Sequence, residues 1–130
     1  LDGGAIESFG CRVSPSEVRA GDEIVVTCFF RALGPVRGSP WVFLHFGQGP
    51  GSVAFQGDHP ALGGLFPPFA WPAGRIVRDA ERVRIPPFAA AGVYRTYFGL
   101  FEGARRLRTD STLGTDGQNR VVGPTIVVRP

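Results

Sequence analysis

Hydrophobic and polar residues alternate along short stretches of this chain, with glycine- and proline-rich segments between them. In residues 23–31, Ile24, Val26, Cys28 and Phe30 occupy every second position. Because successive side chains of a strand point to opposite faces, this period of two predicts a strand with one buried face. Residues 41–46 are apolar on both faces apart from His45, as in a central strand. No stretch shows the period of a helix, so the pattern predicts an all-β protein.

The spacing of these stretches predicts the architecture. We expect strands over residues 5–13, 23–31, 41–46, 52–56, 75–85, 93–101, 104–108 and 120–128, with Pro124 at an edge or a bulge of the last one. About seven to eight short strands at this spacing predict an antiparallel immunoglobulin-like β-sandwich, with residues 1–130 as a single domain. Tyr94, at the start of the 93–101 strand, fits a tyrosine corner, in which the hydroxyl binds backbone at the end of the sandwich.

The two cysteines fall on the first two predicted strands. If these strands form a hairpin, Cys11 lies opposite Cys28, and the inward faces carry Phe9, Cys11 and Val13 on one strand and the alternating residues of 23–31 on the other. Facing cysteines on adjacent strands satisfy the distance limits of a disulfide, which would stabilise the fold by roughly 3 kcal/mol. Two buried free thiols are the alternative. A disulfide would indicate an oxidising compartment.

Composition and charge narrow the classes of function. The formal net charge is only +3, and basic residues alternate with acidic and apolar ones, as in residues 75–79. This indicates a solvated sheet face; an anionic partner such as nucleic acid or an acidic glycan is the alternative. No nucleic-acid-binding module matches, and no run reaches the ~18 apolar residues of a membrane span. The chain begins at Leu1 rather than Met, as expected of a processed mature form or an excised domain.

From residue 13 onward the chain resembles bacterial extracellular immunoglobulin-like domains. The opening Val13-Ser-Pro-x-x-Val18-x-x-Gly21-Asp22-x-Ile24-x-Val26 carries the resemblance. The remainder resembles accessory domains of membrane glycosyltransferases and cell-surface proteins, through residues 42–46, 57–60, 71–74, 77–79, 83–86, 92–101 and 116–120. The resemblance implies a β-sandwich at the cell surface. It supplies no catalytic or ligand-binding residues, and the cysteine pair is an addition to the pattern.

The residues that could support catalysis or bind a metal are scattered. His45 is expected within a strand and His59 in a turn, and no Gly-x-Ser-x-Gly motif occurs, so a nucleophile beside a base is not predicted. Asp79 and Glu81 share a strand face and alternate with Arg78 and Arg82, which suggests cross-strand ion pairs. Two cysteines and two distant histidines lack the ligand spacing of zinc sites. We predict no enzyme activity, no cofactor and no metal, although Asp58 or the group Asp110, Asp116 and Asn119 could hold calcium.

An aromatic loop is the most distinctive candidate for binding. Leu65, Phe66, Phe69 and Trp71 lie within the glycine- and proline-rich connection 57–74. Exposed aromatic side chains can anchor a protein interface or stack on sugar rings. Alternatively they fold back and cover the open end of the core, as long loops commonly do. A second candidate is the basic cluster Arg105, Arg106 and Arg108, which could contact anionic glycans or lipid headgroups or could guard a hairpin edge.

These observations predict a secreted or cell-surface module that makes protein–protein contacts, as an assembly subunit or an accessory domain. The partner would be another protein or a second copy, and exposed first and last strands would permit strand addition. A carbohydrate-binding module that uses the aromatic loop 65–71 is the alternative, and no nucleic-acid partner is expected.

Overall fold

Strands make up nearly all the regular structure of this chain. The computed structural model describes residues 6–36, 38–48, 53–103, 105–106, 109–111 and 120–130, with only the backbone described for 105–106 and 109–111. The elements are β1 (Ile6–Ser14), β2 (Glu17–Arg19), β3 (Glu23–Ala32), β4 (Trp41–Gly47), β5 (Phe55–Gln56), β6 (His59–Pro60), the 3₁₀ turns η1 (Ala61–Gly64) and η2 (Pro68–Ala70), β7 (Ile76–Arg84), β8 (Gly92–Glu102), β9 (Arg105–Arg106), β10 (Thr109–Ser111) and β11 (Val121–Arg129).

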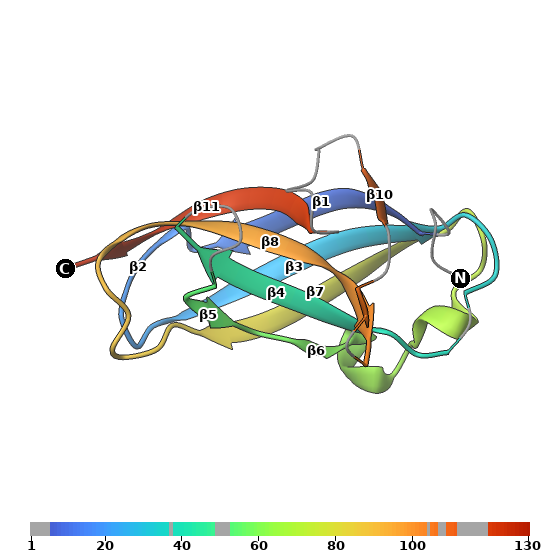
Figure 1. Cartoon of the computed structure of the whole chain (residues 1–130), viewed down its shortest axis with the longest axis horizontal. Coiled ribbons are helices and arrows are strands. Elements are labelled where there is room, and N and C mark those ends of the chain that lie inside the picture. Colours follow the sequence, from blue (N-terminus) through green and yellow to red (C-terminus); the bar gives the residue numbers. More distant parts are fainter. Residues whose placement is uncertain (1–5, 37, 49–52, 104, 107–108, 112–119) are drawn as a thin grey trace.

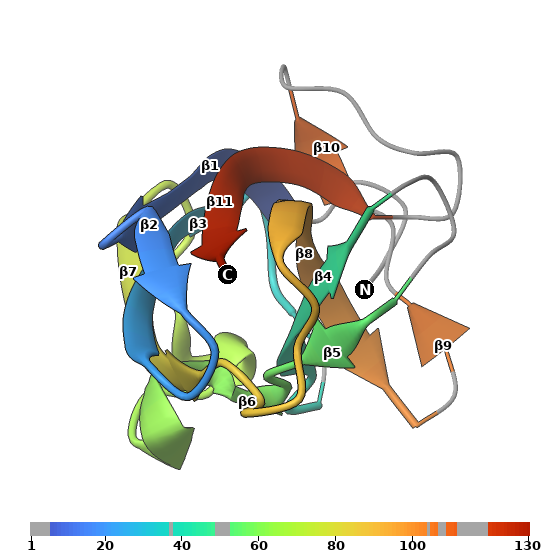
Figure 2. The ribbon, with the colours of Figure 1, turned by 90° about the vertical axis from the view of Figure 1, so that its left-hand side faces the viewer.

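The strands form two facing sheets (Figures 1 and 2). One sheet has the order β10-β1-β3-β7, and the other has the order β2-β11-β8-β4-β5, with β6 paired to β4 and β9 paired to β8. The predicted immunoglobulin-like sandwich is confirmed. The long strands pair antiparallel, whereas the short pairs β1–β10 and β2–β11 are parallel. The short strands β2, β6 and β10 lie in segments where the sequence predicted loops.

The first and last long strands are covered on their outer sides over part of their length, so the prediction that they are exposed edges needs a correction there. β1 lies between β10 and β3, and β11 lies between β2 and β8. β10 pairs with β1 only over residues 6–8, and β2 pairs with β11 only over residues 127–129. Within the described residues, β7 stands at the end of its sheet instead.

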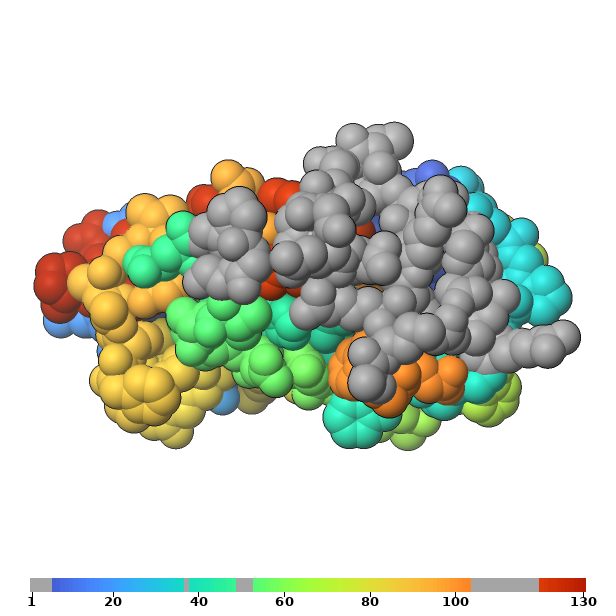
Figure 3. Space-filling view, viewed as in Figure 1, coloured from blue at the N-terminus to red at the C-terminus, as the bar shows by residue number. Residues whose placement is uncertain are grey.

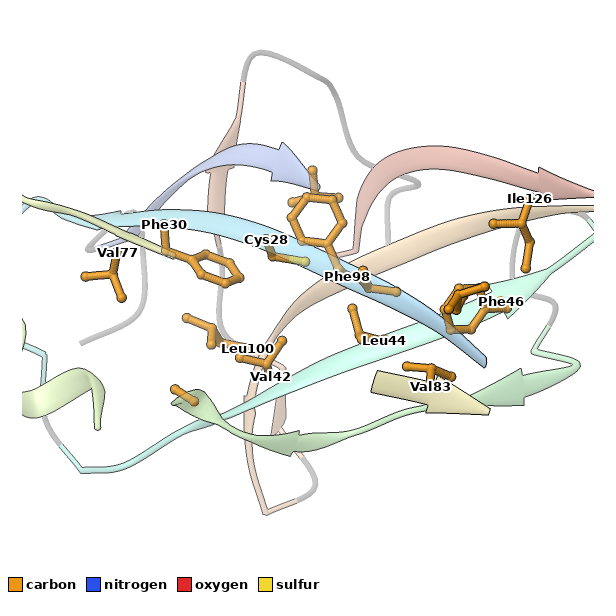
Figure 4. Close-up of a cluster of buried hydrophobic side chains, with 14 of the residues drawn as sticks. Cys28, Phe30, Val42, Leu44, Phe46, Val77, Val83, Phe98, Leu100 and Ile126 are labelled. Carbon is orange, nitrogen blue, oxygen red and sulfur yellow. The ribbon is translucent and has the colours of Figure 1, made fainter. Parts of the chain in front are cut away.

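The core lies between the sheets and follows the alternation in the sequence. Figure 4 shows Cys28, Phe30 and Val77 of one sheet facing Val42, Leu44, Phe98 and Leu100 of the other. Ile24, Val26, Cys28 and Phe30 are at most 1% exposed, which confirms the predicted inward face of β3. β4 is buried on both faces from Val42 to Gly47, as predicted for a central strand.

A β-bulge corrects the predicted inward face of β1. The register passes from Ser8 opposite Phe30 to Gly10 opposite Phe29, which leaves Phe9 as an extra residue. Gly10 has a φ of 108°, a conformation that favours glycine. Phe9 therefore points outward and is 43% exposed. Beyond the bulge Cys11 lies opposite Cys28, and the predicted disulfide between them is present.

Two further local predictions are confirmed. The Tyr94 hydroxyl donates a hydrogen bond of 2.6 Å to the Ala90 carbonyl, which makes the tyrosine corner at the start of β8. Pro124 lies where the pairing of β11 with β8 shifts register between Val122 and Thr125. In the part of the chain that the structure describes, no helix is long and apolar enough to cross a membrane.

Candidate functional site

The aromatic loop lies at one end of the sandwich, beside the segment that leads into β4 (Figures 1 and 3). Its entrance is tight because a Cβ on Gly57 would lie 2.9 Å from a methyl carbon of Val83. Leu62 adopts the left-handed region at φ 49° and ψ 40°, which is unusual for a bulky residue. Its backbone N–H donates a hydrogen bond of 2.8 Å to Asp79 Oδ1, which ties this turn to β7.

Trp71 is the anchor of the loop. Its side chain is only 5% exposed and stacks on Phe30, with ring centroids 6.0 Å apart. Its indole Nε1–H donates a hydrogen bond of 2.8 Å to the Phe66 carbonyl, so the one polar atom of the ring is satisfied. Phe66 is partly buried and packs against the core. These two predicted contact residues therefore cover the open end of the core.

Leu65 and Phe69 are displayed on the outside of the same loop. Leu65 is 91% exposed and Phe69 is 59% exposed. The turns that carry them are closed by backbone hydrogen bonds from Leu65 N–H to the Leu62 carbonyl and from Ala70 N–H to the Pro67 carbonyl, at 3.1 and 2.9 Å. Prolines at 67 and 68 restrict the backbone further. Of the four predicted contact residues, only these two present their side chains to solvent; we call them the apolar knob.

A buried ion pair lies next to the start of the aromatic loop and supports it. His59 in β6 and Asp79 in β7 are 4% and 1% exposed, and His59 Nε2 lies 2.6 Å from Asp79 Oδ2. His59 Nδ1 lies 2.9 Å from the Gly57 carbonyl. Because β6 and β7 belong to different sheets, the pair joins the sheets at this side of the sandwich (Figure 2).

The ion pair favours a charged histidine. Burial by itself lowers the pKa of His59, but the hydrogen bond and charge of Asp79, with smaller contributions from the Gly57 carbonyl and Glu81, outweigh it, so the pKa is raised above 6.5. With the ring protonated, both nitrogens donate hydrogen bonds. The arrangement is that of a structural pair.

This pair replaces two sequence predictions that were wrong. Asp79 and Glu81 share a strand face, but that face is the inner one, and Asp79 pairs with His59 rather than with a neighbouring arginine. His59 lies in a short strand rather than in a turn.

The remaining candidates are not brought together with the knob. His45 lies in β4, with its Nε2 3.9 Å from Asp58 Oδ1 and its Nδ1 3.4 Å from Nη1 of the buried Arg120. Arg105 and Arg106 form β9, hydrogen-bonded to the end of β8, but their side chains and Arg108 lie outside the described residues. Asp116 and Asn119 also lie outside them, and only the backbone of Asp110 is described. Among the described residues, no three His, Cys, Asp or Glu side chains gather as a metal site would require.

One aromatic pair with an exposed tryptophan was not predicted from the sequence. Trp41 is 46% exposed and meets Phe101 edge-on, at 6.4 Å and 64°, over a shallow groove lined also by Ser39, Glu102 and Gly103. The alternation along β4 could have predicted this pair, because alternate residues share a face and Trp41, Phe43 and His45 lie on the face away from the core. The two rings are not parallel, so they do not form one flat platform.

Comparison with known proteins finds similar folds but no family for this chain. No protein-family model and no curated protein matches the sequence. Among solved structures, the chain is similar to the Pseudomonas fluorescens alkylpurine DNA glycosylase AlkC bound to DNA containing an abasic-site analogue, with TM-score 0.61 and 13% identity over 98% of this chain. The match spans only 31% of the glycosylase.

A second structure matches over nearly its whole length. It is a Niemann-Pick type C2 protein from the Japanese carpenter ant, with TM-score 0.51, 9% identity, and coverage of 98% of this chain and 96% of that one. At these identities the two likenesses show a shared β-sandwich and nothing finer.

Proposed function

We propose that this chain is a non-catalytic, extracytoplasmic interaction module that binds a protein partner through the apolar knob, Leu65 and Phe69. The observation that carries the proposal is that two aromatic side chains of the loop are packed on the core while two other apolar side chains are exposed. Trp71 and Phe66 hold the loop on the core while Leu65 and Phe69 stand in solvent. Apolar side chains fixed in this way lose little conformational entropy on binding, as interface anchors commonly do.

The proposed location rests on the disulfide and on sequence resemblance. Disulfides persist in oxidising compartments, and this one is backed by its place in the register of β1 and β3. The resemblance to bacterial extracellular immunoglobulin-like accessory domains points the same way. The DNA bound by the glycosylase is not carried over, because the likeness to it is limited to the fold.

Two observations favour a contact module over an enzyme or a sugar-binding loop. The His59–Asp79 pair has both ring nitrogens engaged and lies inside the sandwich, where a substrate has no access. A sugar platform on the loop would need a pair of exposed, parallel aromatic rings. Trp71 is stacked on Phe30 instead, which leaves Phe69 as the exposed aromatic ring of the loop.

Photo-crosslinking tests the proposal in the cells that make the protein. A photoreactive phenylalanine analogue is placed at Phe69 and, in a matched variant, at Phe88, which is 84% exposed. Phe88 belongs to the connection between β7 and β8, at the other end of the sandwich (Figure 1). We expect one discrete protein adduct from position 69 and none from position 88, and the adduct mass distinguishes a second copy from another protein. Adducts from position 88 alone, or equal diffuse adducts from both, would overturn the proposal.

A further inference from the structure

The outer face of the sheet formed by β1, β3 and β7 is rich in arginine. On β7 the inward positions are Val77, Asp79 and Val83, so the alternate residues point to solvent. These are Ile76, Arg78, Ala80, Arg82 and Arg84, and each is exposed. Alternate residues of a strand are about 7 Å apart, so the arginines form a spaced row along the sheet edge.

The neighbouring strands add two more guanidinium groups, each held over an aromatic ring. The Arg12 guanidinium lies 5.2 Å from the centre of the Phe29 ring, and that of Arg31 lies 5.0 Å from the centre of the Phe9 ring. Phe29 lies opposite Arg78 in the register, so the three strands contribute to one continuous surface. The bulge at Phe9 turns that ring outward onto this face.

The face carries an excess of positive charge. Its acidic residues are Glu7, which pairs with Arg31 at 2.5 Å, and Glu23, opposite Arg84 in the register. Among the described residues, no carboxylate lies within ion-pair distance of the remaining arginines of the face, Arg12, Arg78, Arg82 and Arg84. On β1, β3 and β7 five arginines stand against two glutamates, and Asp110 of β10 lies opposite Glu7 in the register, so the face keeps an excess of positive charge.

We propose that this arginine face binds an acidic polysaccharide, through hydrogen bonds and ion pairs from the guanidinium groups to carboxylate or sulfate groups of an extended chain. Guanidinium groups bind such planar or tetrahedral anions with paired, charge-assisted hydrogen bonds. A repeating anion along the polymer can meet the row on β7 and the groups on β1 and β3 together. The inference concerns a different face and a different ligand from those of the apolar knob.

The geometry disfavours single-stranded nucleic acid as the occupant. Single strands are bound largely by stacking their bases on aromatic rings, and here Phe9 and Phe29 are already covered by Arg31 and Arg12.

The test measures binding of polygalacturonate and dextran sulfate to the full chain by titration calorimetry, with neutral dextran as the uncharged control. The face variant carries Arg78→Gln, Arg82→Gln and Arg84→Gln. We expect the wild-type chain to bind one or both acidic polymers, with an affinity that falls steeply as salt is added, and the face variant to lose at least about tenfold in affinity and to show a shallower salt dependence.

A matched variant removes the same number of charges from the other sheet, through Arg19→Gln, Arg95→Gln and Arg129→Gln, and each variant is checked for an unchanged thermal midpoint. If the face variant unfolds, the single change Arg78→Gln takes its place. Equal losses in both variants would mean that net charge alone is responsible and would overturn the proposal. It would also be overturned if wild type binds neither acidic polymer, or if it binds a single-stranded oligonucleotide or anionic phospholipid vesicles more tightly than both.

Discussion

The two ends of the sandwich each expose a phenylalanine, but they hold it differently. At one end Phe69 stands on a loop fixed by buried Trp71 and by the His59–Asp79 pair. At the other, Phe88 stands on the short connection between β7 and β8, which is held by hydrogen bonds from the Tyr94 hydroxyl to the Ala90 carbonyl and from the Ala89 N–H to the Pro86 carbonyl. Exposure alone therefore does not mark a contact surface. We propose that a rigid support prepares an exposed side chain for binding, and each support can be removed separately by mutation.

The largest effect is expected from removing the anchor of the aromatic loop. Trp71→Ala takes away the stack on Phe30 and opens the end of the core, so the free energy of unfolding should fall by about 3–5 kcal/mol. Urea denaturation of the variant and the wild-type chain measures this loss of free energy. The result would be contradicted by a loss below about 1 kcal/mol, which is the size expected of a surface change.

A somewhat smaller loss is expected when the buried ion pair is broken. Asp79→Asn leaves His59 without its counter-charge and weakens the acceptor for the Leu62 N–H, which should cost about 3 kcal/mol. The same denaturation series measures this loss. A variant as stable as wild type at neutral pH would show that the pair contributes nothing to the fold.

The same pair predicts a dependence on pH. Because the pKa of His59 is raised in the folded state, the pair's contribution is fully present below pH 6.5 and is lost as the pH rises through the raised pKa. Unfolding midpoints of the wild-type chain should therefore fall from slightly acidic to alkaline pH. Asp79→Asn should flatten this slope, and an equal slope in both chains would contradict the assignment.

At the opposite end, a smaller effect is expected. Tyr94→Phe removes the hydroxyl that binds the Ala90 carbonyl but keeps the buried ring, so the loss should be about 1 kcal/mol. A loss as large as that of Trp71→Ala would mean that the two ends are supported equally, which would break the comparison.

Local patterns in the sequence predicted much of the fold. The alternation in β3, the pairing of Cys11 with Cys28 and the tyrosine corner each depend on residues close in sequence or on adjacent strands. The bulge at Phe9 was missed because an alternating pattern does not show where one residue is skipped. It is this bulge that places Phe9 outside the core.

The candidate site was harder to predict because its support depends on distant residues. Asp79 was expected to pair with an arginine across the strands because it alternates with Arg78 and Arg82. It lies inside because His59, 20 residues earlier and in the other sheet, supplies its partner. Trp71 likewise could not be assigned to the core until Phe30 was known to lie beneath it. The sequence singled out the loop but did not show which of its side chains face outward.

The most direct test of the account is the stability of the double variant Leu65→Ser, Phe69→Ser. If these side chains are held in solvent for a partner, the isolated chain does not need them, and the free energy of unfolding should stay within about 0.5 kcal/mol of wild type. A loss of about 2 kcal/mol or more would show that they pack against the fold, and would contradict the central claim that the loop is divided between anchor and contact.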